Sequence, residues 1–192
     1  MNTIQSTQNR TVSKRSYLTA GEVDKLAECA RKGSRYGLRD SLMITMAYRH
    51  GFRAVEITAL EWNQIDFDAH RLHVVRAKNG EPSVHPLNGE EVRALKALQR
   101  DTKSTGFVFI SERGAPMTPD SFLKLVKRLG ESAELSFPIH PHMLRHACGY
   151  ELANKGVDTR ALQMYLGHKN MQNTVRYTKL AVDRFKGWNN LL

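Results

Sequence analysis

Hydrophobic residues recur at helical spacing, three or four positions apart, over most of the chain. Such segments cover residues 20–33 and 38–50, one that begins at 53, one that follows 88, one from 119, 141–155 and 159–167. Short apolar runs typical of strands occur at residues 65–67, 72–76, 83–87 and 107–110. The pattern predicts a mainly α fold with a small antiparallel β-sheet. The segment 38–50 is apolar over much of its circumference, so we expect it at the centre of the core.

Helix starts are marked by capping residues. Thr19 with Glu22, and Asn88 with Glu91, have the spacing of capping boxes, in which each side chain accepts the backbone N–H of the other residue. Pro119 suits the first turn of a helix because its missing N–H has no intrahelical partner there. These signals predict helices that begin just after residues 19, 88 and 118.

The pair Asn79-Gly80 lies between two predicted strands and favours a tight hairpin turn, since both residues tolerate positive φ. Lys78 then lies at the tip of the hairpin. A long cationic side chain there either stays in solvent or reaches into a groove of a partner.

The ends of the chain differ from its middle. Residues 1–16 are polar and contain no acid, so we expect a flexible basic arm, in which Lys14 and Arg15 contact DNA or the arm stays idle. Residues 17–179 form one predicted domain. Residues 180–192 predict a C-terminal helix that either packs on its own domain or is exchanged between protomers.

The charge of the chain favours a polyanionic partner. Its 192 residues contain 29 Lys plus Arg and 19 Asp plus Glu, a formal net charge of +10, although a basic protein with no such partner is also common. Lys124, Lys127 and Arg128 lie on the polar face of the helix from 119, where they can follow phosphates. There are two cysteines, no apolar run of transmembrane length and no glycine-rich phosphate loop. We expect a reduced cytoplasmic protein without membrane contact or nucleotide hydrolysis.

The candidate chemistry lies between residues 140 and 177. His142 and Arg145 are three apart and share one helix face, and a guanidinium binds phosphate with two parallel charged hydrogen bonds. Tyr177 is the candidate nucleophile, and His168 precedes it by nine positions. Taken singly, a tyrosine or histidine of this kind is more often a packing residue.

A zinc site is an alternative. His142 and His146 have the spacing of zinc ligands on a helix, and Cys148 is close in sequence. However, no Glu lies between the histidines as in a zinc protease, and Arg145 would place a fixed positive charge beside the ion. We therefore rank zinc well below phosphate chemistry and expect no metal.

The complete set resembles the tyrosine recombinase (phage integrase) family: Arg53, Lys78, His142, Arg145, His168 and Tyr177. The resemblance implies the catalytic-domain fold of that family. It makes Arg53 and Arg145 the phosphate clamps and Lys78 the general acid. Tyr177 would attack DNA and form a 3′-phosphotyrosyl intermediate.

The same resemblance assigns the neighbouring residues. His142 and His168 would bond the scissile phosphate, Glu56 would be a supporting acidic residue, and His146 would have a packing role. Without the resemblance, Arg53 and Glu56 would pass as a surface pair worth a few tenths of a kcal/mol. Because one ester bond replaces another, the reaction implied needs no metal, ATP or other cofactor.

Residues 139–146 and 165–168, with the short chain, resemble the enterobacterial fimbrial-switch invertases of this family. These invert a promoter-bearing segment between inverted repeats and so control fimbrial phase variation. The resemblance implies a nucleoid-associated protein that acts as a tetramer on double-stranded DNA with inverted repeats, aided by host DNA-bending proteins. A non-cleaving transcriptional regulator of the same fold is the alternative. A monomeric topoisomerase is disfavoured because the apolar C-terminal segment suits a partner.

Overall fold

The computed structural model describes residues 15–77, 80–101 and 106–179. The helices in these ranges are α1 (Ala20–Gly33), α2 (Gly37–Arg49), α3 (Ala54–Thr58), the 3₁₀ turn η1 (Trp62–Gln64), α4 (Gly89–Asp101), α5 (Pro119–Ser132), α6 (Pro141–Asn154), α7 (Thr159–Leu166) and α8 (Gln172–Lys179). The strands are β1 (Ile65–Asp66), β2 (Arg71–Val74) and β3 (Ser83–Pro86), in an antiparallel sheet of that order. The predicted fold class is confirmed.

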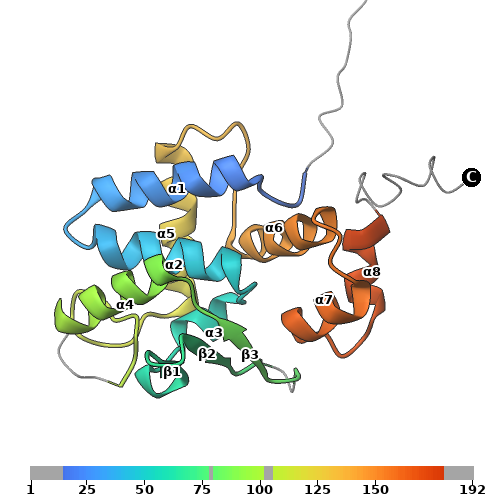
Figure 1. Cartoon of the computed structure of the whole chain (residues 1–192). Coiled ribbons are helices and arrows are strands. Elements are labelled where there is room, and N and C mark those ends of the chain that lie inside the picture. The colour runs from blue at the N-terminus through green and yellow to red at the C-terminus, as the bar shows by residue number, and fades with distance from the viewer. Residues whose placement is uncertain (1–14, 78–79, 102–105, 180–192) are drawn as a thin grey trace, which may run out of the picture.

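Helix α2 is the centre of the core, as its apolar pattern predicts. Its side chains Leu42, Met43, Ile44, Met46 and Ala47 are all buried, and the helix packs against α1, α4 and α6. Figure 1 shows α6, α7 and α8 grouped at the right of the molecule, with the small sheet at the bottom, below α2 and α3. The residues that follow α2 therefore lie where the helical core, the sheet and the C-terminal helices meet.

The predicted capping residues are in place. Thr19 Oγ1 accepts the N–H of Glu22, and the Glu22 carboxylate accepts the N–H of Thr19 at 2.8 Å. Asn88 Oδ1 accepts from Glu91 N at 2.9 Å, and the Glu91 carboxylate accepts from Asn88 N at 3.0 Å. These bonds satisfy N–H groups that have no partner inside a helix, and so fix where α1 and α4 begin.

Two elements differ from the sequence predictions. Residues 107–110 form only isolated bridges, one between Phe107 and Glu61 and one between Ile110 and Pro116. The segment pairs with two different neighbours, and a proline has no N–H with which to continue a ladder, so no strand forms. Helix α8 was not predicted. It begins where Asn170 Oδ1 accepts the N–H of Gln172 at 2.8 Å, a helix-start signal that we overlooked.

The hairpin has the predicted partners but shorter strands. Strand β2 pairs with β3 from Arg71 opposite Pro86 to Val74 opposite Ser83, and it ends two residues before the predicted end at 76. The side chain of Arg76, two positions beyond β2, is buried like those of Leu72 and Val74, so the alternation of buried and exposed residues continues past the end of the strand. Lys78 and Asn79 at the predicted tip lie outside the described residues, as do residues 1–14 and 180–192 with the predicted arm and C-terminal helix.

Within the described ranges, no helix is long and apolar enough to cross a membrane.

Candidate active site

The carboxylate of Glu56, in the first turn of α3, is the centre of the site. Its oxygens accept hydrogen bonds from Arg53 N at 2.9 Å and from Arg53 Nη1, from Arg76 Nη1 at 3.0 Å and from Ala77 N at 3.1 Å. Burial raises the pKa of Glu56, but the Arg53 N–H and the charges of Arg76, Arg145 and Arg53 outweigh it and hold the pKa below its usual value. Glu56 is therefore an ionised, buried support and not half of a surface pair.

Arg145 lies beside this carboxylate. Its side chain is 3% exposed, its Nη1 is 3.8 Å from Glu56 Oε2, and it donates to the carbonyls of Gly51 and of Leu166, the latter at 2.7 Å. Burial and the charges of Arg53 and Arg76 lower the pKa of Arg145 to about 10, so it stays protonated at neutral pH. The sequence prediction that Arg53 and Arg145 come together is consistent with these contacts, since both reach the same carboxylate.

Gly51 makes this approach possible. It has φ +58°, and a Cβ there would lie 2.5 Å from Leu166 Cδ2. Any side chain at this position would be strained and would push α7 away from the turn after α2. The glycine thus brings its carbonyl within reach of Arg145 Nη1.

Arg76 also belongs to the site, although it was not among the residues predicted from the sequence. Its guanidinium is fully buried next to Glu56 and near Arg145. An arginine at the end of a strand is usually exposed, although the period of two residues places this one on the same buried face as Leu72 and Val74. With it, three guanidiniums surround one carboxylate, which leaves a formal charge of +2 (3 − 1) in this part of the site.

Tyr177 of α8 is buried at the edge of the arginine cluster, with 1% of its surface exposed. Its hydroxyl is 2.9 Å from His146 Nδ1, and its ring stacks on His168 and meets the ring of Tyr150 edge-on. Burial raises the pKa of Tyr177, while the charges of Arg145 and Arg176 partly oppose the rise. The phenol is therefore protonated at neutral pH and needs a base before it can attack.

His146, for which we expected a packing role, has its Nδ1 hydrogen-bonded to the Tyr177 hydroxyl. Burial, followed by the charges of Arg176 and His142, lowers the pKa of His146 to about 4. The imidazole is neutral at pH 7. Arg176 Nη2 lies 3.5 Å from its Nε2, and a guanidinium only donates, so in this position of α8 Nδ1 carries the ring proton and donates to the Tyr177 oxygen. No local pattern in the sequence signals this pairing, since the two residues are 31 positions apart.

The other two predicted histidines also lie at the site. His168 Nδ1 is 2.9 Å from Thr174 Oγ1, and burial together with the charge of Arg145 lowers the pKa of His168 to about 3. His142 is exposed and its ring meets that of His146 edge-on at 5.8 Å. Desolvation and Arg145 lower the pKa of His142 as well. Both rings are thus neutral hydrogen-bonding groups beside the arginines.

The zinc alternative gains no support from Cys148. Its Sγ donates to the carbonyl of Arg49 at 3.5 Å, and burial raises the pKa of its thiol to about 12. Throughout the described residues, no three His, Cys, Asp or Glu side chains are grouped as metal ligands.

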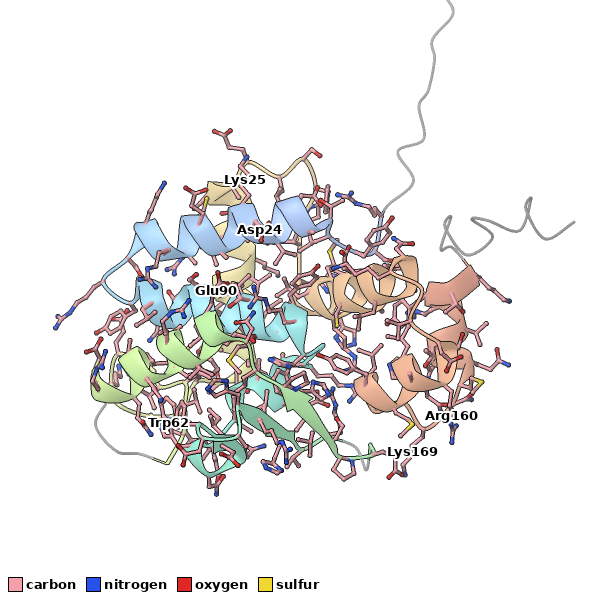
Figure 2. The ribbon with its side chains drawn as sticks, in the orientation of Figure 1. Asp24, Lys25, Trp62, Glu90, Arg160 and Lys169 are labelled. Atoms are coloured by element: carbon pink, nitrogen blue, oxygen red, sulfur yellow. The ribbon has the colours of Figure 1, made fainter. Side chains whose placement is uncertain are left out.

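A groove of about 890 Å³ between β3 and α7 extends to His168. Arg160 at the start of α7 and Lys169 just after it are exposed on its wall, and Figure 2 shows both at the α7 side of the molecule. Glu81 is exposed on the same groove, so these three charged side chains sum to +1 (2 − 1), an excess that we did not predict from the sequence.

The other basic residues predicted to bind DNA are placed as follows. Lys124, Lys127 and Arg128 are exposed on α5, where Lys124 pairs with Asp120. Arg15 bonds to Glu22, and its guanidinium lies 5.0 Å from the centre of the Phe137 ring. Their DNA contacts stay predictions.

The packing of the Tyr177 ring against α6 can be tested by adding a methyl group at Gly149. A Cβ on Gly149 would lie 2.8 Å from two atoms of the Tyr177 ring. Gly149→Ala should therefore displace the ring and lower the free energy of unfolding by about 1–3 kcal/mol, measured by urea unfolding. Gly21→Ala is the control: nothing lies within 4 Å of its added Cβ, so it should be neutral or stabilising by up to about 1 kcal/mol. Equal effects of the two changes would contradict the packing described here.

The buried side chain of His85 predicts that the free energy of unfolding falls in acid. Burial and the charges of His50 and Arg76 lower the pKa of His85 from 6.5 to about 3. Between these values the unfolded chain takes up a proton that the folded chain refuses, so the free energy of unfolding falls as the pH falls. One such group contributes at most about 1.4 kcal/mol per pH unit. His85→Phe, which keeps the stacking on Tyr165, should make the slope from pH 6 to pH 4 shallower by about 1 kcal/mol per unit. An unchanged slope in urea unfolding would show that folded His85 accepts the proton.

Comparisons with known proteins show the family of the chain. The model of the phage integrase family matches residues 16–184. The chain is 41% identical over 190 residues to the type 1 fimbriae regulatory protein FimE of Escherichia coli (strain K12), covering 94% of this chain and 96% of FimE. It is 32% identical over 176 residues to the tyrosine recombinase XerD of Ralstonia nicotianae, covering 88% of this chain and 57% of XerD.

A solved structure has the same fold. The crystal structure of the XerA recombinase superposes with a TM-score of 0.76 at 22% sequence identity, over 91% of this chain and 64% of that one.

Proposed function

This chain belongs to the phage integrase family, and we propose that it is a site-specific tyrosine recombinase that cleaves and rejoins DNA through a 3′-phosphotyrosyl intermediate. Its similarity to XerD supports the chemistry, and its similarity to FimE supports a role in fimbrial regulation.

The observation that carries the proposal is the convergence of Arg53 and Arg145 on the Glu56 carboxylate, with Tyr177 beside them. Together with Arg76, the cluster has an excess of about two positive charges (3 − 1). A phosphodiester has one negative charge, and the pentavalent transition state of its cleavage has two. Buried guanidiniums in fixed positions stabilise such developing charge strongly. The cluster therefore favours the transition state over the bound diester.

The proposed reaction exchanges one phosphoester bond for another. The Tyr177 oxygen forms a bond to phosphorus as the bond from phosphorus to the 5′ oxygen breaks, and the 3′ phosphate stays on the tyrosine. His146 takes the phenol proton on Nδ1 in the tautomer whose ring proton lies on Nε2, which requires that Arg176 leaves Nε2. Lys78 gives a proton to the departing 5′ oxygen, because an unprotonated alkoxide is a poor leaving group. Arg53 and Arg145 stabilise the negative charge of the transition state, so we propose that neither a metal ion nor ATP takes part.

The burial of Tyr177 adds a requirement. Only 1% of its surface is exposed, so its oxygen cannot meet a DNA phosphate while α8 keeps the described position. We therefore include in the proposal that binding of DNA shifts α8 and brings the hydroxyl to the phosphate held by Arg53 and Arg145.

For the biological role, we propose inversion of a promoter-bearing segment that controls fimbrial phase variation, as the similarity to FimE supports. In this proposal a tetramer assembles on inverted repeats in the nucleoid, with help from host DNA-bending proteins. The groove beside Arg160 and Lys169 would hold DNA near the site. The three basic residues of α5, together with Lys14 and Arg15, would bind backbone phosphates farther out.

Covalent trapping tests this function. Wild-type protein is incubated with genomic DNA and denatured, and the DNA attached to it is sequenced to obtain the repeat. A duplex with that repeat and a nick next to the scissile phosphate should then give an adduct that survives denaturant, in EDTA and without ATP. The alternative, a regulator that binds without cutting, predicts tight binding of genomic sites with no adduct.

A further inference from the structure

Arg76 donates four hydrogen bonds, each to a different residue. Its Nη1 donates to Glu56 Oε2 at 3.0 Å and to the carbonyl of Gly51 at 3.3 Å. Its Nη2 donates to the carbonyl of His50 at 3.0 Å and to that of Tyr165 at 2.6 Å. One side chain thus joins the end of β2 to α3, to the turn after α2 and to α7.

Burial of the charged Arg76 guanidinium costs free energy. Burial lowers the pKa of Arg76 against the opposing charge of Glu56, and its Nε is a buried nitrogen without a hydrogen-bond partner in the described part of the chain. Arg145, a second buried cation, uses the same Gly51 carbonyl and the same carboxylate. A buried ion pair is often no more stabilising than apolar residues of similar volume. Stability alone therefore does not explain an arginine here.

The stem of Arg76 is enclosed by two glycines. A Cβ on Gly80 would lie 2.8 Å from Arg76 Cβ, and a Cβ on Gly167 would lie 2.6 Å from Arg76 Cγ. Gly80 follows the tip of the hairpin, and Gly167 ends α7 with φ +64°. The side chain is therefore held in one conformation between the hairpin and α7.

The backbone next to Arg76 is fixed by the same carboxylate. Ala77 N donates to Glu56 Oε1 at 3.1 Å, while the Arg76 guanidinium binds Oε2. Glu56 also accepts from Arg53, one of the phosphate clamps. The two residues before position 78 are thus tied to the arginine cluster by hydrogen bonds of both side chain and main chain.

We infer that Arg76 is a positioning residue for the general acid. Together with Glu56 it anchors the base of the β2–β3 hairpin to the arginine cluster, so that Lys78, the next residue but one, reaches the departing 5′ oxygen. This inference rests on the proposed function, in which Lys78 protonates that oxygen.

The test compares two substrates on the full-length protein. One is the nicked duplex with the trapped repeat, and the other has sulfur in place of the bridging 5′ oxygen at the scissile phosphate. A thiolate is a far better leaving group than an alkoxide, so cleavage of the sulfur substrate does not need a general acid. Arg76→Met keeps an unbranched side chain of similar length and removes the guanidinium. Lys78→Ala is the reference, and Arg145→Lys is the matched control for a guanidinium that meets the phosphate itself.

The inference predicts a selective defect. Arg76→Met and Lys78→Ala should both slow cleavage of the oxygen substrate by about 10²-fold or more, the usual contribution of a general acid. On the sulfur substrate both should return to about wild-type rate, while Arg145→Lys stays slow on both. If Arg76→Met does not fold by thermal unfolding, Arg76→Lys replaces it. Lysine keeps the charge but cannot reach four acceptors, so the same selective rescue is expected.

Three results would overturn the inference. Equal losses of Arg76→Met on both substrates would show that Arg76 acts through the phosphate clamp or the fold, and no loss would show that it has no role. If Lys78→Ala is not rescued by sulfur, the assignment of Lys78 fails, and the positioning role fails with it. A failure of the whole proposed function is different, because wild-type protein would then give no adduct on either substrate.

Discussion

Tyr177→Phe should abolish the covalent adduct and leave DNA binding unchanged. The change removes the one oxygen that is proposed to attack phosphorus, while phenylalanine keeps the ring in its seat beside Gly149 and His168. The lost hydrogen bond to His146 should lower the free energy of unfolding by about 0.5–1.5 kcal/mol. The adduct is measured on a denaturing gel, and binding is measured by gel shift with the same nicked duplex.

Tyr150→Phe is the control for this change. Tyr150 lies in the same cluster and meets the Tyr177 ring edge-on at 5.1 Å, so the two substitutions remove the same group from neighbouring rings. Tyr150→Phe should still form the adduct. An adduct with Tyr177→Phe would show that another residue attacks the DNA.

Arg145→Lys should reduce the cleavage rate by about 10²–10³-fold or more, the effect of removing one buried group that stabilises a developing negative charge. The guanidinium spans the carbonyls of Gly51 and Leu166, and a lysine ammonium cannot hold both and still face a phosphate. A buried ammonium also tends to lose its proton. Single-turnover cleavage with saturating protein measures the rate without a contribution from weaker binding.

Arg39→Lys is the matched control for a buried arginine. Arg39 is 8% exposed and is paired with Asp40 near the start of α2, about 15 Å along the helix from Arg49 at its end. The change should lower the free energy of unfolding but leave the single-turnover rate of the folded protein as in wild type. If both lysine variants cleave at similar rates, Arg145 does not stabilise the transition state.

Local signals were sufficient to predict much of the fold. The capping pair Thr19 and Glu22 and the pair Asn88 and Glu91 fixed two helix starts, because each pair acts within four residues. The apolar circumference of α2 placed it in the core. Residues 107–110 were predicted wrongly because a strand needs a continuous neighbour, and the sequence does not show that Pro116 is the neighbour at one end.

The site was predictable only in part, for a related reason. Order and spacing of the family motifs identified residues such as Arg53 and Tyr177. Arg76 was missed because its acceptors come from segments that are distant in sequence, and only the folded chain places them around one side chain. The bond between His146 and Tyr177 was missed likewise, since it joins two helices and follows no periodic pattern.

The central claim is that the Tyr177 oxygen becomes bonded to DNA, and the most direct measurement identifies the linked residue. The adduct trapped with wild-type protein is digested with nuclease and trypsin, and the modified peptide is sequenced by mass spectrometry. We expect the peptide Tyr177-Thr178-Lys179 with a 3′-nucleotide phosphate on its tyrosine. A nucleotide on any other residue, Tyr150 or Tyr165 included, would contradict the account.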